Sequence, residues 1–509
     1  MRTRVFGICL GLMVMGAMGA WAQASSYFDV TEYGAVGDGV TLNTEAIQKA
    51  VDTCAGAGGG RVVIPPGKFL TGPIMLKSNI NVEIMAGATL LASTDIDAYP
   101  GVPGRWEGIE RTVYASLFTG HELENVSITG RGLIDAQGEV WWEAHEKNKD
   151  LRDKYDIEGR EPDNPPDSPL KWPRPRTINL YHCNNVLIRD INIIDSPSWT
   201  IHPVYCEDVT VDNVTIVQPY ESPNTDGINP DSCRNVRISN CYVDVGDDCV
   251  TIKSGYNEDG RRVGIPCENI VVTNCTFAHG RGGVVIGSEM SGDVRNVTVS
   301  NCIMDGTYRG LRVKTGRGRG GVVENLRATN LVFRNVGDTG FSVTMGYSGD
   351  IDEKEPVTEG TPILRNFTWS NVTMIDVDHV ARVSGLPEMP VQNLTLRDVH
   401  AVSSDDGMRI STVEGLELEN VVVNTREGSA IKLSNVSDVE LDDVTTHEPN
   451  ERSPVILLEN VSDAVIRNCK ATEGTGTFVG LVGDDCTQIR MFQNLMEHAR
   501  EERGAVSEN

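Results

Sequence analysis

The chain is poor in aromatic and in basic residues. Phe, Trp and Tyr make up 6% of its 509 residues, and 45 Lys and Arg stand against 72 Asp and Glu, for a formal net charge of -27. A chain this acidic is not expected to bind nucleic acid through a general basic surface. No two of its 12 cysteines are spaced as Cys-x-x-Cys, which argues against a zinc site. Long helical patterns are also missing between the apolar segments, which excludes a helical or leucine-rich solenoid.

The N-terminus has the pattern of a secretory signal peptide. Arg2 and Arg4 precede an apolar run over 5–20, and small residues at Ala20, Ala22 and Ala24 fit a cleavage site near Ala22 or Ala24. The run is short for a membrane span of about 20 residues, and no second candidate span follows. We therefore expect residues 1–24 to be removed and the mature protein to be secreted or periplasmic, with no membrane partner.

A repeated phrase runs through the rest of the chain. It reads NVRISNCYV from Asn235, NIVVTNCTF from Asn269 and NVTVSNCIM from Asn296, with weaker copies up to Asp463. Each copy alternates apolar and polar residues, is rich in Val, Ile and Thr, and has Asn, Asp or Gly at its corners. Copies about 22–29 residues apart indicate stacked units. We predict an all-β chain, a right-handed parallel β-helix, as a single domain over 25–509.

Three departures from the repeat have their own interpretations. Thr44–Cys54 has an amphipathic pattern and predicts an N-terminal capping helix, and Gln488–Arg503 predicts a second helix that caps the other end. Residues 135–176 interrupt the repeat and predict a large inserted loop. The cysteines that follow Asn in the repeat predict small buried side chains rather than a disulfide framework. Eleven cysteines, an odd number, remain after cleavage.

Three carboxylates are candidates for chemistry. Asp226 and Asp247 lie 21 residues apart, close to one coil, so Asp226, Asp247 and Asp248 should meet on one face, helped by a bend at Gly246. Carboxyls this close raise the pKa of at least one of them, and glycosidic hydrolysis needs such a pair of acid and base. Ordinary corner residues or a calcium site are the alternatives.

A local excess of positive charge follows these carboxylates. From Cys249 to Gly320 ten Lys and Arg stand against six Asp and Glu. Arg312 and Lys314 alternate along a predicted strand, so both can point to the same side, about two coils beyond Asp248. Arg offers a fork for a carboxylate and Lys a point charge. This pattern favours an anionic substrate, with a solvated strand carrying protective charges as the alternative.

Together these motifs resemble glycoside hydrolase family 28, the polygalacturonases. The resemblance rests on Asn224-Thr-Asp-Gly227, Gly246-Asp-Asp248 and Arg312-Val-Lys314, in this order, and extends from about Tyr27 through at least Tyr347. The segments Ser196–His202, Gly287–Gly292 and Arg312–Gly321 look like the exo-acting branch. The resemblance implies a pectin lyase-like solenoid and a hydrolase that inverts the anomeric centre.

The same resemblance implies roles for individual residues. Asp247 would be the general acid, and Asp226 and Asp248 would hold and deprotonate the attacking water. Arg312 and Lys314 would bind a uronate carboxylate, and Asn224 and Tyr347 would contact substrate. The family also has a Gly-His-Gly whose histidine supports the acid–base cluster. In Ala278–Ser288 that position falls on Arg281, with His279 two residues earlier, so either His279 serves in its place or Arg281 replaces it and alters substrate preference.

The expected function is therefore exo-acting hydrolysis of α-1,4-galacturonosyl linkages in pectic polysaccharide or oligogalacturonides. Rhamnogalacturonan or another uronate-containing glycan is an alternative substrate, and Arg281 at the position of the family histidine makes it a serious one. A polysaccharide lyase and a non-catalytic glycan-binding β-helix are the alternatives from other classes. We expect no cofactor and no metal, because hydrolysis by paired carboxyls needs only water. The sequence does not fix the oligomeric state.

Overall fold

The structure is a computed structural model that describes residues 27–157, 164–347 and 349–506. The expected signal peptide, residues 1–24, lies outside these residues. Within the described part, no helix is both long and apolar enough to span a membrane.

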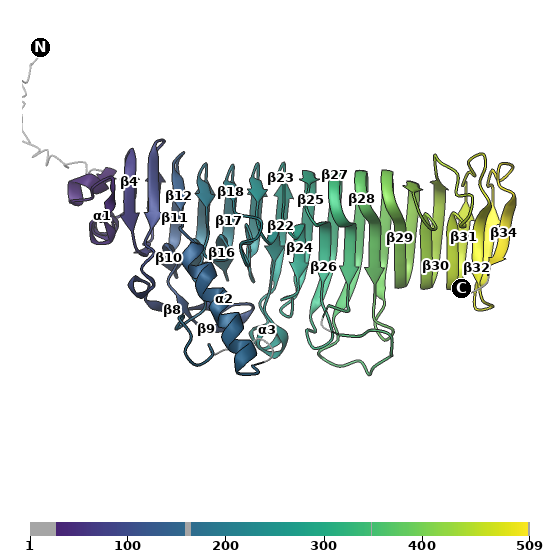
Figure 1. The fold of residues 1–509 in the computed structure, drawn as a ribbon, viewed down its shortest axis with the longest axis horizontal. Helices are drawn as coiled ribbons and strands as arrows, with labels where there is room; N and C mark the ends of the chain where they lie inside the picture. The colour runs from purple at the N-terminus through teal and green to yellow at the C-terminus, as the bar shows by residue number, and fades with distance from the viewer. Residues whose placement is uncertain (1–26, 158–163, 348, 507–509) are drawn as a thin grey trace, which may run out of the picture.

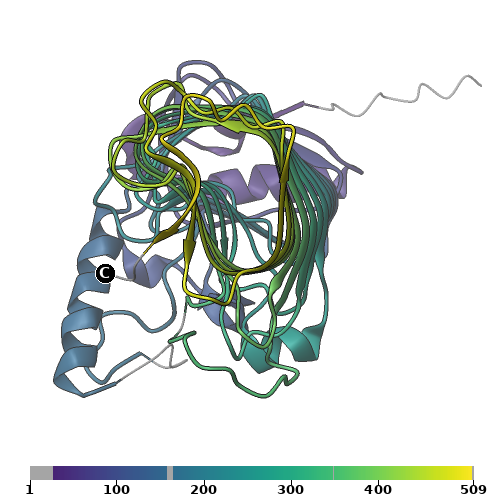
Figure 2. The same ribbon diagram turned by 90° about the vertical axis from the view of Figure 1, so that its right-hand side faces the viewer.

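The chain forms a right-handed parallel β-helix, as predicted (Figure 1). Successive coils pair in parallel: β14 (Asn184–Arg189) pairs with β17 (Glu207–Asp212), which pairs with β19 (Arg234–Ser239), which pairs with β22 (Cys267–Thr273). Seen along the axis in Figure 2, the coils lie one behind another. The apolar residue of each alternating pair points inward, so one continuous core runs the length of the solenoid.

Stacked asparagines fix the corners of the coils. Six equivalent positions adopt the left-handed conformation with φ between +57° and +61°, which Asn tolerates better than most residues. After the first, the side-chain amide of each donates to the carboxamide oxygen of the asparagine one coil before it, at 2.9–3.2 Å. The ladder comprises Asn235, Asn269, Asn296, Asn325, Asn366 and Asn393. The repeated Asn is therefore a structural device, which accounts for its regular spacing.

One parallel sheet of the β-helix carries the candidate site, and we call it the site sheet. It begins with β5 (Ile74–Met75), β10 (Phe118–His121), β13 (Ile178–Tyr181) and β16 (Ile201–Val204). Single bridges through Ile228 connect it to β21 (Asp248–Ile252). It continues through β24 (Gly282–Gly287) and β26 (Arg309–Lys314), and then through one segment each of β27 (Val322–Thr344), β28 (Ile363–Ser384), β29 (Val391–Thr425), β30 (Ile431–Thr445) and β31 (Ile456–Arg467).

The two ends of the solenoid differ. Helix α1 (Thr44–Gly56) confirms the predicted N-terminal cap and buries Ile47, Val51 and Cys54. The predicted helix over Gln488–Arg503 is wrong: β33 (Thr487–Phe492) and β34 (Glu501–Val506) stand there. Ile489 and Met491 alternate inward against β31, whose edge offers a ladder of backbone hydrogen bonds that an isolated helix would leave unused.

The interruption at 135–176 is not a loop throughout. Helix α2 (Glu139–Lys154) occupies its first half and stands off the coils (Figure 1). Trp141 fixes it, because this buried ring packs edge-on against Tyr99 and Tyr114, with both centroids 5.2 Å away. The helix thus has its own small apolar cluster apart from the main core.

The cysteines follow the prediction of small buried side chains. The eleven in the described residues form no disulfide, and all but Cys486 are buried. Cys9 lies outside the described residues.

Candidate active site

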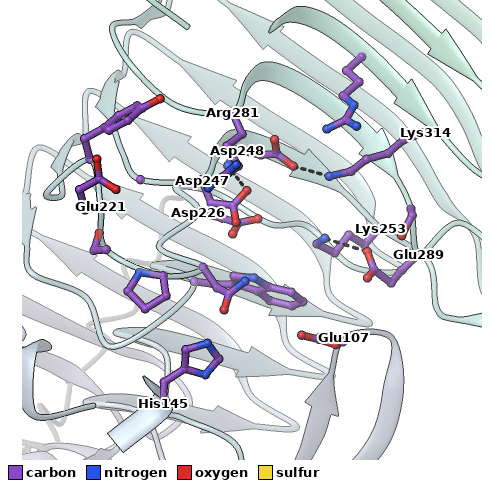
Figure 3. A pocket seen from close by; sticks show the side chains of 18 of the residues that line it. Glu107, His145, Glu221, Asp226, Asp247, Asp248, Lys253, Arg281, Glu289 and Lys314 are labelled. Atoms are coloured by element: carbon purple, nitrogen blue, oxygen red, sulfur yellow. Dashed lines mark hydrogen bonds and ion pairs between the residues drawn. The ribbon is translucent and has the colours of Figure 1, made fainter. Parts of the chain in front are cut away.

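Three carboxylates from two neighbouring coils meet on the site sheet (Figure 3). Asp226 lies in the turn before Ile228, and Asp247 and Asp248 lie at the start of β21 on the next coil. One oxygen from each of the three carboxyls lies within 4.8 Å of the others. The cluster that the 21-residue spacing predicts is therefore present, with Asp226 and Asp248 buried and Asp247 partly exposed.

Gly246 allows the two adjacent aspartates to share one cluster. A Cβ at this position would lie 2.5 Å from the carbonyl oxygen of Ser222, so no other residue fits without moving the neighbouring turn. Regular strand geometry begins at Asp248, so Asp247 is not held to the opposite face of the strand.

Hydrogen bonds leave one oxygen of each buried aspartate free. Asp226 accepts at Oδ2 from Asn229 Nδ2 at 2.8 Å and from Thr251 Oγ1 at 3.1 Å. Asp248 accepts at Oδ2 from Lys314 Nζ at 2.8 Å. In the described part of the chain, Oδ1 of Asp226 and Oδ1 of Asp248 are buried without a hydrogen-bond partner. Two unpaired carboxyl oxygens on neighbouring aspartates are suited to holding a water molecule.

Burial and mutual repulsion raise the pKa of two of these carboxyls. Burial raises the pKa of Asp226 to about 8, and the negative charge of Asp247 adds to the effect. Burial also raises the pKa of Asp247 to about 6, with a further contribution from Asp248; Lys314, Lys253 and Arg281 oppose the rise. The cluster therefore retains a proton near neutral pH, as a general acid requires.

Cations flank the carboxylates at both ends of the site strands. Arg312 and Lys314 lie on β26, both beside the ring of Tyr347, at 5.4 and 5.6 Å from its centroid. Arg281 stands at the other end, just before β24, with its side chain exposed at the mouth of the pocket. Neither Arg281 nor Arg312 makes a side-chain hydrogen bond or ion pair with any residue that the structure describes. In so acidic a chain, two unpaired guanidinium groups in one pocket indicate an anionic ligand.

The pocket around these groups has a volume of about 600 Å³. It is lined by the three aspartates, Arg281, Arg312, Lys314, Asn224 and Tyr347, by His145, Glu146 and Lys149 of α2, and by Glu107 and Trp199. Asn224 belongs to the rim: its carboxamide oxygen accepts a 2.6 Å hydrogen bond from the buried Arg174. Most residues singled out from the sequence thus meet in one cavity.

His279 is the exception. Its Nδ1 lies 2.9 Å from Oδ1 of Asp244, its side chain is 56% exposed, and it does not line the pocket. Arg281 lies there instead, and its backbone N–H donates to the carbonyl oxygen of Asp247 at 3.0 Å. The structure therefore brings Arg281, and not His279, to the carboxylates.

A buried ion pair under the cluster was missed by sequence reasoning. Lys253 Nζ lies 2.9 Å from Oε2 of Glu289, with both side chains at most 5% exposed, and the ammonium group lies 4.6 Å from the ring centroid of Trp199. Burial opposes the charge on Lys253, but Glu289 and Asp226 outweigh it and raise the lysine pKa. A lysine directly after the buried strand β21 (Asp248–Ile252) is the signal that could have revealed this pair.

A β-hairpin lies across the site sheet on the N-terminal side of the pocket. It consists of β8 (Gly101–Trp106) and β9 (Ile109–Tyr114), the antiparallel pair of the described fold. Its Arg105 forms a buried 2.9 Å ion pair with Asp231 of the sheet. Its Glu110 accepts a 3.0 Å hydrogen bond from Tyr205 and pairs at 2.9 Å with Arg262 of helix α3 (Asn257–Val263). The hairpin is thus held both to the sheet and to helix α3.

The three carboxylates could also be considered as a cation site. Calcium takes six to eight oxygen ligands, without competing positive groups among them. Here the Lys314 ammonium already binds Asp248, and Lys253 and Arg281 are close enough to lower the pKa of Asp247. The donor set therefore fits acid–base chemistry better than calcium coordination.

Comparison with known families gives one assignment. Residues 54–408 match the family model described as glycosyl hydrolases family 28. This range contains every candidate site residue named above.

Individual relatives are similar over most of the chain. A probable polygalacturonase of Vitis vinifera is 34% identical and covers 77% of each chain. An exo-poly-alpha-D-galacturonosidase of Dickeya chrysanthemi is 28% identical over 68% of this chain and 62% of its own. Among solved structures, a hyperthermoactive exopolygalacturonase from Thermotoga maritima has a TM-score of 0.68 and 34% identity, and covers 78% of this chain and 91% of its own.

Proposed function

Since the chain belongs to glycosyl hydrolase family 28, and is thus a glycoside hydrolase, we propose that it cleaves α-1,4-galacturonosyl linkages of pectic polysaccharide or oligogalacturonides from a chain end. The observation that carries the proposal is one pocket that joins three clustered carboxyls with two unpaired arginines. The carboxyls supply the acid and the base, and the arginines supply receptors for uronate groups.

Asp247 is the general acid. It is the most accessible carboxyl of the cluster, so it alone can reach a glycosidic oxygen bound in the pocket. Its raised pKa, about 6, keeps a proton available in mildly acidic solution. The proton passes from Asp247 to the leaving oxygen as the C–O bond breaks, and Asp247 is left ionised.

Asp226 and Asp248 hold the attacking water. Their unpaired Oδ1 atoms contact one water molecule. Asp226, whose pKa is raised to about 8 and which therefore stays protonated, orients the water, and Asp248 takes a proton from it as the water oxygen bonds to the anomeric carbon. Lys314 fixes the orientation of Asp248 through its 2.8 Å contact. The product is a free uronic acid and a chain shortened by one unit.

We propose inversion at the anomeric carbon, because the water binds beside the acid before cleavage and no covalent step is required. Spacing alone would favour the other outcome: the nearest carboxyl oxygens lie within 4.8 Å, against about 6.5–9.5 Å between the two carboxyls of typical inverting enzymes. That rule describes one acid and one base. Here a separate pair of carboxyls, Asp226 and Asp248, holds the water, so the water need not lie between the acid and a single base. Proton NMR of the first-formed anomer distinguishes the two outcomes.

Substrate recognition is assigned to the cations. Arg312 and Lys314, with Tyr347 beside them, receive one uronate carboxylate next to the acid. Arg281 offers a second carboxylate receptor at the opposite end of the strands, which favours two consecutive uronates. A rhamnogalacturonan, in which uronate alternates with a neutral sugar, would leave one of these receptors unused.

Attack from a chain end follows from the hairpin at 101–114. It lies over the site sheet at Asp231 and Tyr205, so a long glycan cannot continue past the pocket in the N-terminal direction. The helix α2, which lies within the predicted insertion 135–176, forms a side wall of the pocket. A polymer can therefore enter with one end only.

Export is part of the proposal, on the basis of the N-terminal pattern at 1–24, because pectic polymers lie outside cells. N-terminal sequencing of the mature protein, with a new terminus after Ala22 or Ala24, tests it.

Product analysis tests the activity. Purified protein is incubated with polygalacturonate and with rhamnogalacturonan oligosaccharides. The products are separated, and the ultraviolet absorbance that the new double bond of a lyase product would add is followed. Release of galacturonate monomer from polygalacturonate without an absorbance rise supports the proposal. A ladder of oligomers contradicts the exo mode, an absorbance rise indicates a lyase, and binding without release indicates a non-catalytic protein.

A further inference from the structure

A second groove lies on the site sheet beyond the catalytic pocket. It has a volume of about 350 Å³ and is formed by three consecutive coils. Its polar lining consists of three cations and three hydroxyls, Arg382, Arg409, Lys432, Ser384, Ser411 and Ser434. No carboxylate lines it, which is unusual in a chain of net charge -27.

Strand register connects this groove to the catalytic cations. Arg312 pairs with Ser342 on the next coil, which pairs with Arg382, then Arg409, then Lys432. The hydroxyl row likewise continues Lys314 through Thr344, Ser384, Ser411 and Ser434. Equivalent residues of a parallel sheet point the same way, so both rows lie on the face that carries the active site. Four coil steps of about 4.8 Å place Lys432 roughly 19 Å from Arg312.

The row has a defined end. On the next coil Lys432 pairs with Leu457 and Ser434 with Glu459, so both the cations and the hydroxyls stop at β31. An anionic chain that lies along the sheet would therefore find matching groups over β28 to β30 and none beyond them.

Each cation keeps donors available for a ligand. Arg382 lies 2.6 Å from Nε2 of His379 and 3.5 Å from Asp338, and Arg409 contacts Asp406 and donates to the carbonyl oxygen of Ser429 at 3.1 Å. Lys432 lies 3.0 Å from Glu459. Their side chains nevertheless stay 50%, 30% and 38% exposed. A guanidinium has five N–H donors, and one carboxylate engages at most two of them in a fork. These partners engage two N–H groups of each arginine, one on each terminal nitrogen, and leave the other three for a ligand.

We infer that Arg382, Arg409 and Lys432 form a binding track for the part of an anionic polysaccharide that extends beyond the catalytic pocket. The inference rests on the proposed function, since it takes the polymer end to be held at Asp247. The hairpin covers the N-terminal side of the pocket, so the remaining chain leaves in the C-terminal direction, where the track lies. Carboxylates of successive uronates pair with the cations, and sugar hydroxyls with the serines.

Two of the three cations lie outside the part of this chain that matches the family model. The family match ends at residue 408, and Arg409 and Lys432 follow it. The track therefore runs across the C-terminal limit of the family match, with Arg382 inside it and Arg409 and Lys432 beyond it.

The test compares a long and a short substrate. The Arg409→Gln/Lys432→Gln double variant and an Arg382→Gln variant are assayed on polygalacturonate and on digalacturonate, which is too short to reach the track. We expect kcat/KM on polygalacturonate to fall about tenfold in the double variant, a loss typical of charge-assisted contacts, and to stay unchanged on digalacturonate. Arg327→Gln, an exposed arginine on another side of the coil, is the matched control, and retained digalacturonate hydrolysis shows that each variant folds.

Equal loss on both substrates, or no loss on polygalacturonate, would overturn the inference. Affinity electrophoresis through gels containing polygalacturonate reports on the track without catalysis. If the wild type hydrolyses neither substrate, the proposed function fails. In that case the gels still test the track. Slower migration of the wild type that is lost in the double variant supports the track, and migration that is the same in both proteins refutes it.

Discussion

Lys314 Nζ lies 2.8 Å from Oδ2 of Asp248, although 66 residues separate them in the chain. Two coil steps, from β21 to β24 and from β24 to β26, bring them together. This contact links the proposed receptor for the substrate carboxylate to a group that we propose to hold the attacking water. It also supplies positive charge that opposes the rise in the pKa of Asp247.

Replacing Lys314 should therefore change the pH profile as well as the rate. In Lys314→Gln, Asp247 loses a neighbouring cation, so its pKa rises above about 6. Because activity falls at high pH when the acid loses its proton, the alkaline limb of kcat/KM should move to higher pH. We expect kcat/KM at the optimum to fall at least about tenfold. Lys68→Gln, an exposed lysine on β4 (Gly67–Thr71), should change neither quantity; an unmoved alkaline limb in Lys314→Gln would argue against the coupling.

Arg281 and His279 can be separated by substitution. In Arg281→Ala the pocket loses a carboxylate receptor, so KM for digalacturonate should rise about tenfold. The alkaline limb should again move upward, because Arg281 also lowers the pKa of Asp247. His279→Ala should leave both unchanged, since its ring pairs with Asp244 outside the pocket. The opposite pattern, with His279→Ala impaired and Arg281→Ala normal, would show that His279, and not Arg281, supports the carboxylate cluster.

The buried pair Lys253–Glu289 should matter to stability. In Lys253→Met, Glu289 is left as a buried charge without its ammonium partner, which costs about 3–5 kcal/mol of the free energy of unfolding. The double variant Lys253→Met/Glu289→Gln removes both charges and should recover part of this loss. Thermal or denaturant unfolding of the three proteins provides the comparison; a single variant within about 1 kcal/mol of the wild type would show that the pair is dispensable.

Removal of divalent cations should not affect activity. Lysine and arginine side chains surround the carboxylates, and the proposed steps use only these carboxyls and water. Dialysis against EDTA should leave kcat and KM on digalacturonate unchanged. Activity that disappears on chelation and returns with calcium would instead make the cluster of Asp226, Asp247 and Asp248 a metal site.

Much of the fold was predictable because its signals are local and repeated. Asn235, Asn269 and Asn296 mark corners that only a few residue types tolerate, and the apolar alternation between them defines strands. The carboxylate cluster followed from the same regularity, since 21 residues is nearly one coil. Arg312 and Lys314 could be placed on one side because strand alternation is strict.

The errors arose where nonlocal contacts decide the structure. The apolar residues Ile489, Phe492 and Met496 are spaced as on one face of a helix. The edge of β31 was open for pairing, however, and Ile489 lies in the strand β33 that pairs with it. The helix α2 within 135–176 depends on Trp141 meeting Tyr99 and Tyr114, which precede it by more than 20 residues. The hairpin at 101–114 and the pair Lys253–Glu289 are likewise held by partners that are distant in the sequence.

The most direct test of the account is the rate of Asp247→Asn on digalacturonate. The substitution removes the proton donor and keeps the size of the side chain, so kcat should fall about 10²–10⁴-fold with little change in KM. Asp244→Asn, a carboxylate nearby on the outer surface that pairs with His279, should stay close to the wild type. An Asp247→Asn enzyme that retains kcat within about tenfold of the wild type would contradict the assignment of Asp247 as the general acid, and with it the mechanism proposed for this pocket.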